Sequence, residues 1–186
     1  MITKSFKEYN SIEGSVVTIG TFDGIHLGHQ DIIYKLQEIS NKKKLKSIVL
    51  SFFPHPKIVL QNSTDIKLIN TLDEKVEILK KYNIDYFIIK EFTKEFSRLT
   101  ALEFVRDILV NTLNAKHLIV GYDHHFGRNR GANIIQLREF GEIYDFEVTE
   151  ISPRKINDIS ISSTKIRALL KEGKIDYANK YLDEYF

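Results

Sequence analysis

The sequence contains no cysteine and only three prolines in 186 residues, so a disulfide framework is excluded. No stretch approaches the roughly 20 apolar residues that a membrane-spanning helix needs. The first ten residues, MITKSFKEYN, lack the apolar core of a secretory signal. These absences predict a cytoplasmic protein without a membrane span.

Several enzyme signatures are also missing. The chain has no GxxxxGK[ST] phosphate loop, no HExxH, no GxSxG and no GxGxxG. Their absence argues against P-loop kinases, zinc proteases, α/β-hydrolases and nicotinamide-dependent dehydrogenases.

The charges nearly cancel, with 27 Lys and Arg against 25 Asp and Glu and a net charge of +2. Such a balance gives no strong field to gather nucleic acid or anionic lipid, so we expect a small-molecule partner. The basic run NKKKLK at 41–46 is typical of a solvated helix end, where cations complement the helix dipole. The length and the 42% hydrophobic content predict one domain with a substantial core.

Apolar runs alternate with helical patterns along the chain. We expect strands at 16–19, 47–52, 86–89, 117–120 and 146–151, whose continuous apolar character suits parallel strands buried on both faces. Helical spacing of apolar residues recurs between them, at 32–39, 72–79, 102–113 and 134–140. Thr71 with Glu74 and Thr100 with Glu103 match the capping box of a helix start. This alternation predicts an α/β fold, a doubly wound parallel sheet of about five strands flanked by helices.

Ligands of such sheets bind beyond the carboxyl ends of the strands. The unusual polar segments fall there: GTFDGIHLGH at 20–29, PHP at 54–56, GYDHHFGRNRG at 121–131 and SISSTKIR at 160–167. The expected fold and the polar segments therefore agree on where a site would form.

The segment 20–29 places three glycines and two histidines at a strand-to-helix junction. A helix entrance has unpaired N–H groups and a positive dipole end, and glycine lets the backbone approach a polyphosphate closely. If the helix has begun by Leu27, His26 and His29 share one face and can point at one anion. The alternatives are a plain turn with surface histidines, or a zinc site that lacks a third ligand.

The other segments are individually less specific. Ser162, Ser163 and Thr164 precede a helix and could hold phosphate oxygens while Lys165 or Arg167 neutralises charge, although a plain N-cap explains the same residues. Segment 121–131 is composed like a flexible loop that closes on a ligand, or like a mobile polar turn. Pro54 and Pro56 stiffen a strand exit, which would position His55 and Phe52 or Phe53 against a flat ring, or simply form a rigid core edge.

Together, GTFDGIHLGH and ISSTKIR resemble the HxGH and (I/V)SSTxxR motifs of the nucleotidylyltransferase superfamily, which face each other across the ATP phosphates. The order FDGxHxGH, FxPHP and GxDxxFGxxRxG is similar to the FMN adenylyltransferase (FAD synthetase) module of bacterial bifunctional riboflavin kinase/FMN adenylyltransferases, over nearly the whole chain. His124 and His125 depart from the aromatic and basic residues that many members carry.

The resemblance implies a Rossmann-like fold over residues 1–186 that transfers AMP from ATP to FMN, with magnesium carried by ATP and no metal ligand from the protein. It implies that the chain lacks the flavokinase domain of the full-length family. The catalytic residues implied are His26, His29 and Arg167. The ATP-binding residues expected are Gly20, Thr21, Phe22, Asp23, Gly24, Gly28, Asp123, Ser163, Thr164 and Lys165. The FMN-binding residues expected are Pro54, His55, Pro56, Phe126 and Arg128.

The FMN phosphate is largely dianionic at neutral pH, so its attack on the α-phosphate of ATP needs no general base. We therefore expect the histidines to orient and stabilise the α-phosphate, and Arg167 to hold the leaving pyrophosphate. The alternatives are adenylyl or cytidylyl transfer to a pantetheine phosphate, nicotinamide mononucleotide or a polyol phosphate on the same scaffold, or a non-catalytic nucleotide or flavin sensor.

Overall fold

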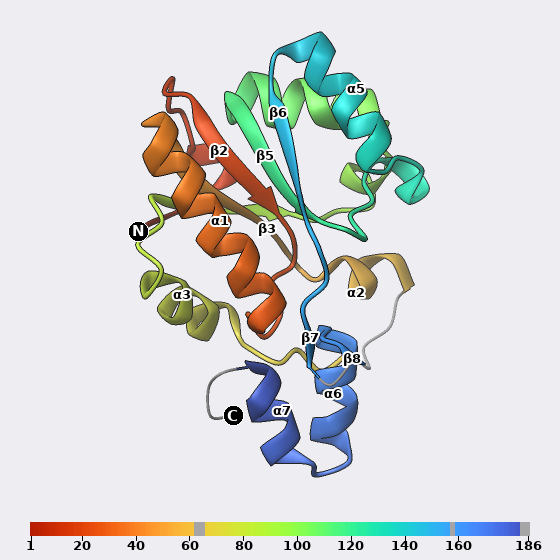
Figure 1. The fold of residues 1–186 in the computed structure, drawn as a ribbon. Coiled ribbons are helices and arrows are strands. Elements are labelled where there is room, and N and C mark those ends of the chain that lie inside the picture. Colours follow the sequence, from red (N-terminus) through yellow and green to blue (C-terminus); the bar gives the residue numbers. More distant parts are fainter. Residues whose placement is uncertain (62–65, 157–158, 183–186) are drawn as a thin grey trace.

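The computed structural model describes residues 1–61, 66–156 and 159–182 (Figure 1). Its main sheet has six parallel strands in the order β1-β4-β3-β2-β5-β6. The strands are β1 (Ile2–Ser5), β2 (Ser15–Ile19), β3 (Lys46–Phe53), β4 (Tyr86–Glu91), β5 (Ala115–Gly121) and β6 (Glu147–Ile151). At the centre of the sheet, Val17 of β2 lies opposite Ile48 of β3 and Leu118 of β5.

Helices follow most strands. They are α1 (Leu27–Lys43), α2 (Pro56–Gln61), α3 (Leu72–Lys80), α4 (Ala101–Glu103) continued by the π-helix η3 (Phe104–Thr112), α5 (Ile134–Tyr144), α6 (Ser163–Lys171) and α7 (Ile175–Leu182). Short 3₁₀ turns are η1 (Phe6–Glu8), η2 (Phe96–Arg98) and η4 (Arg128–Arg130), and β7 (Lys155–Ile156) pairs antiparallel with β8 (Ile159–Ser160). No helix in the described ranges has the length and apolar character that crossing a bilayer requires.

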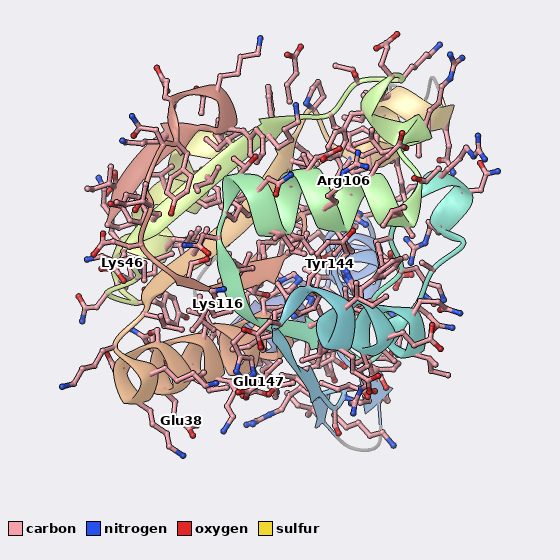
Figure 2. All side chains as sticks on the ribbon, turned by 90° about the horizontal axis from the view of Figure 1, so that it is seen from above. Glu38, Lys46, Arg106, Lys116, Tyr144 and Glu147 are labelled. Atoms are coloured by element: carbon pink, nitrogen blue, oxygen red, sulfur yellow. The ribbon has the colours of Figure 1, made fainter. Side chains whose placement is uncertain are left out.

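Both faces of the sheet are covered, as the continuous apolar strands predict. Val17 and Ile19 of β2 pack in one core cluster with η3 and α5, whereas Val16 packs in a second cluster with α1 and α3. Figure 2 views the molecule from the end where the strands begin, at which Lys46, Lys116 and Glu147 lie. The predicted α/β doubly wound architecture is therefore confirmed.

The helix starts and ends follow the local sequence. Thr71 accepts a hydrogen bond from the Glu74 N–H at 3.2 Å, and Glu74 accepts one from the Thr71 N–H at 2.7 Å, so the predicted capping box is present. The second capping box, of Thr100 and Glu103, is also formed. Helix α1 ends within the basic run at Lys43, as expected, and the C-cap Lys44 terminates it with a left-handed φ of 56°.

The sheet has one strand more than expected. Strand β1 is a four-residue edge strand, largely exposed, that pairs only with β4. Its sequence ITKS carries no apolar run because an edge strand needs few buried side chains, so apolar patterning does not reveal it.

The strand order fixes where a ligand can bind. From β2 the chain builds β3 and β4 on one side and β5 and β6 on the other, so the order reverses between β2 and β5. The crevice at such a reversal, beyond the carboxyl ends of the strands, is the usual ligand site of open α/β sheets. Segments 20–26 and 121–127 leave the sheet at this place, and α6 and α7 lie beyond the same end of the sheet (Figure 1).

Candidate functional site

Two stacked imidazoles stand at the entrance of helix α1. The helix begins at Leu27 with His26 as its N-cap, and the His26 Nδ1 accepts a hydrogen bond from the His29 N–H at 3.3 Å. The two rings are nearly parallel, with centroids 3.7 Å apart and an interplanar angle of 13°. The prediction that His26 and His29 share one face of a helix entrance is confirmed.

Both rings are held in their neutral form. Burial lowers the pKa of His26 to about 4, although the carboxylates of Asp23 and Asp123 favour its charged form. Burial, with the charges of His26 and Lys75, holds the pKa of His29 well below its usual range. Because the His26 Nδ1 accepts a hydrogen bond, the proton of the neutral ring lies on Nε2, which can donate to a ligand.

Asp23 joins the β2–α1 loop to the C-terminal part of the chain. Its carboxylate is 1% exposed and accepts hydrogen bonds from Arg167 Nη1 at 2.5 Å and from the Ile69 N–H at 2.9 Å. Its backbone carbonyl accepts a hydrogen bond from Ser163 Oγ at 2.8 Å. The loop with the histidines and the start of α6 therefore meet through one residue, as the paired motifs predict.

The polar residues at the start of α6 have two roles: one caps the helix, and others contact Asp23. Ser162 is the N-cap and accepts from the Lys165 N–H at 3.4 Å, so the plain capping interpretation holds for this residue. Ser163 and Arg167 both bind Asp23, and Arg167 Nη2 donates to Thr164 Oγ1 at 3.3 Å. Lys165 instead lies exposed and its Nζ donates to the Ser160 carbonyl at 2.8 Å, away from the Asp23 contacts.

The glycines of the first motif act in different ways. Gly24 has a φ of 87°, which side chains rarely adopt, and a Cβ there would lie 2.9 Å from Ile69. A Cβ on Gly28 would lie 3.3 Å from the His26 ring, so this glycine makes room for the capping imidazole. A Cβ on Gly20 would lie 3.1 Å from the buried ring of Phe22. Of the three glycines, only Gly24 has a positive φ.

Segment 121–131 is anchored rather than free. Phe126 and Ala132 exchange backbone hydrogen bonds of 3.0 and 3.2 Å. The Phe126 ring is 6% exposed and packs at 5.9 Å from Phe104 on one side and from His124 on the other. The ring therefore packs in the core and supports the loop, and the expectation that Phe126 contacts FMN stays a prediction.

The remaining residues of this loop differ in their relation to the histidines. Asp123 lies near enough to His26 to raise its pKa. Arg128 is exposed at the start of η4, and within the described ranges no hydrogen bond or ion pair connects it to the site. Burial lowers the pKa of His124 to about 4.

A small pocket opens where β3 ends. It is lined by Thr21, Phe52, Phe53, His55, Leu68, Asn70, Leu72 and Lys75. Pro56 begins α2, and the His55 Nδ1 accepts a hydrogen bond from the Lys57 N–H at 3.2 Å. The structure thus brings His55 and both aromatic rings of the SFFPHP segment to one pocket.

Sequence reasoning missed Lys75. This residue of α3 is 8% exposed, and its Nζ donates to the Thr21 carbonyl at 2.6 Å. The signal that could have found it is its position between Leu72 and Leu79 on the apolar face of α3, where a charged residue is unexpected.

In the described part of the chain, no group of three or more His, Cys, Asp or Glu side chains is arranged to hold a metal ion. The buried acid of the site, Asp23, already has its carboxylate engaged by Arg167 and by the N–H of Ile69.

Comparison with known proteins adds relatives and structural neighbours. The family model described as FAD synthetase matches residues 8–165. The bifunctional riboflavin kinase/FMN adenylyltransferase of Buchnera aphidicola subsp. Acyrthosiphon pisum is 41% identical over 182 residues, covering 98% of this chain and 58% of that protein. The FAD synthetase of Listeria monocytogenes is 35% identical over 169 residues, covering 90% of this chain and 68% of that protein. The chain thus spans less than two thirds of the length of the bifunctional relatives.

Among solved structures, one titled macrolide-efflux protein from Streptococcus pneumoniae superposes with a TM-score of 0.88 at 30% identity, over 98% of this chain and 60% of that one. The pantoate-β-alanine ligase of Francisella tularensis superposes with a TM-score of 0.58 at 14% identity, over 96% of this chain and 85% of that one, and so shares the fold.

Proposed function

The chain belongs to the FAD synthetase family, and from that premise we propose that it transfers AMP from ATP to FMN, forming FAD and pyrophosphate. The observation that carries the proposal is the meeting of two phosphate-binding segments at Asp23. One segment supplies the neutral pair His26 and His29, and the other supplies Ser163 and Arg167.

The two segments offer complementary donors to a triphosphate. Helix α1 presents its N-terminus, where the dipole is positive, together with the Nε2–H of His26. The start of α6 offers hydroxyls and the remaining N–H groups of Arg167, whose guanidinium can bind phosphate oxygens in bidentate fashion. We assign the α-phosphate to the histidines and the departing pyrophosphate to Arg167.

In the proposed step, an oxygen of the FMN phosphate forms a bond to the α-phosphorus of ATP. The bond from that phosphorus to the oxygen shared with the β-phosphate breaks, and pyrophosphate leaves with the electron pair. Because the second pKa of a phosphate monoester is about 6, the attacking group is largely dianionic at neutral pH. The lowered pKa values of His26 and His29 support a role as neutral donors that stabilise the charge in flight.

Magnesium enters this proposal with ATP. When bound, it neutralises charge on the phosphate oxygens, and it is held mainly by those oxygens and by water. The engagement of Asp23 by Arg167 and a backbone N–H supports this assignment, because it leaves the acid no free role as a metal ligand.

The acceptor decides between this function and its alternatives. The purified chain is offered ATP and magnesium with FMN, phosphopantetheine or nicotinamide mononucleotide, and pyrophosphate and the dinucleotide product are measured. We expect product only with FMN as the acceptor, with FAD and pyrophosphate formed in equal amounts. Product from another acceptor would replace FMN in the proposal, and ATP binding without pyrophosphate release from any acceptor would indicate a nucleotide sensor.

A further inference from the structure

Lys75 is a buried cation that makes no direct ion pair with a carboxylate of the described residues. Its side chain is 8% exposed, and the acceptor of its ammonium group is the Thr21 carbonyl at 2.6 Å. Among the described residues, no ion pair joins Lys75 to a carboxylate. A charge removed from water is costly unless it is paired, so an unpaired buried ammonium group indicates a role beyond packing.

Neutralisation of Asp23 does not account for Lys75. The Asp23 carboxylate is already paired with Arg167 at 2.5 Å and accepts from the Ile69 N–H at 2.9 Å. Lys75 instead approaches the backbone of the same loop, at Thr21. The loop therefore carries one ion pair and, beside it, one cation that forms no ion pair of its own within the described ranges. The Asp23 carboxylate acts on that cation only as a nearby charge that favours its protonated form.

The surroundings of Lys75 indicate the kind of anion that it would take. Lys75 lines the same pocket as Phe52, Phe53 and His55. Its charge also lowers the pKa of His29, so the ammonium group lies within electrostatic reach of the histidine pair. A ligand bound over this small pocket would meet aromatic rings and one ammonium group, which suits a molecule with a flat apolar part and an anionic end.

We propose that Lys75 binds the phosphate of the acceptor nucleotide and presents it to the histidine pair. This inference rests on the proposed function, under which the acceptor is FMN: the aromatic side chains hold the flavin ring, and Lys75 pairs with the 5′-phosphate. Burial lowers the pKa of Lys75, and a bound phosphate would favour its charged form again. Lys75 thus acts in acceptor binding, whereas Arg167 acts on the phosphates of ATP.

The test compares FMN with riboflavin, which has the same ring but no phosphate. Binding of each is measured by flavin fluorescence for the wild-type chain, for Lys75→Met and for Lys75→Gln, which keeps a donor for the Thr21 carbonyl. Lys80→Met is the matched control, because Lys80 lies exposed on the same helix and pairs with Glu77.

Loss of one charge-assisted phosphate contact should weaken FMN binding by about 10- to 100-fold in both Lys75 variants. Riboflavin binding should stay within about 2-fold of the wild type, because riboflavin lacks the group that Lys75 contacts. In turnover, the KM for FMN should rise while the KM for ATP stays unchanged. Lys80→Met should alter none of these values.

Two results would overturn the role of Lys75: an unchanged preference for FMN over riboflavin in both variants, or an equal loss of affinity for both flavins, which would indicate a structural role. If Lys75→Met fails to fold, Lys75→Gln supplies the same comparison. Failure of the proposed function would show in the wild-type chain itself, as an absence of FAD from ATP and FMN.

Discussion

Replacing Asp23 by Asn removes the charge that connects the two halves of the site while keeping the shape of the side chain. Breaking a fully buried ion pair by removing one partner costs roughly 3–5 kcal/mol. Asp23 is 1% exposed, but the Arg167 side chain is 19% exposed, so solvent compensates part of the loss. The amide oxygen can still accept from the Ile69 N–H. We therefore expect the free energy of unfolding to fall by about 2 kcal/mol.

The assay is urea denaturation of the wild type, Asp23→Asn, Arg167→Met and the double variant. If the two side chains act as a pair, the double variant should lose about 1–2 kcal/mol less than the sum of the single changes. Asp107→Asn is the control, because it makes the same chemical change in an exposed ion pair, with Arg106 (Figure 2). This substitution should change the free energy of unfolding little. Additive losses in the cycle, or a cost for Asp23→Asn as small as that of the control, would show that Asp23 and Arg167 do not stabilise the fold as a buried ion pair.

Three further predictions concern the histidines and Arg167. His29→Ala and Arg167→Ala should each lower the rate of FAD formation by about 100-fold or more, the usual loss when a charge-stabilising donor is removed; near-normal turnover would take that residue out of the mechanism. FAD formation should stay level from pH 7 to 9, because the lowered pKa values keep both imidazoles neutral throughout; a steep fall in initial rates would indicate a required imidazolium. The pKa of His26 falls from 6.5 in the unfolded chain to about 4 in the folded chain, so between these values the unfolded chain binds the extra proton. The contribution of His26 to the free energy of unfolding should therefore be present above pH 6.5 and should fall by about 3 kcal/mol as the pH falls toward 4. Urea unfolding at both ends of this range should show a smaller loss in His26→Asn, and an equal loss there would contradict the assignment.

The parts of the fold that could be predicted are those in which side chains and local signals agree. Continuous apolar runs located β2 to β5 because these strands are covered by helices on both faces. Strand β6, at the edge of the sheet, is only partly buried, and its prediction started from the apolar residues around it. Capping residues located the starts of α3 and α4. Strand β1 escaped prediction because its stability comes from backbone pairing with β4, which leaves no apolar pattern. Apolar spacing also located the helix over 104–112 without revealing that it is a π-helix.

For the site, the sequence predicted well which segments meet, but it predicted less well which way each side chain points. The strand order brings the loops after β2 and β5 together, and Ser163 and Arg167 reach Asp23 as the motifs imply. The direction of the Phe126 ring depends on Phe104, a residue 22 positions earlier in the sequence, so its place in the core could not be predicted. The same holds for Lys75, whose burial is decided by the way α3 packs beside the β2 loop.

We propose that this chain holds ATP between the β2–α1 loop and α6 and transfers AMP to FMN. The most direct test is to incubate the purified chain with ATP, magnesium and FMN and to measure FAD and pyrophosphate together, alongside Arg167→Ala. We expect equal amounts of both products from the wild type and a rate lower by about 100-fold or more in the variant. Wild-type protein that releases no pyrophosphate with FMN, or a variant that makes FAD at the wild-type rate, would contradict it.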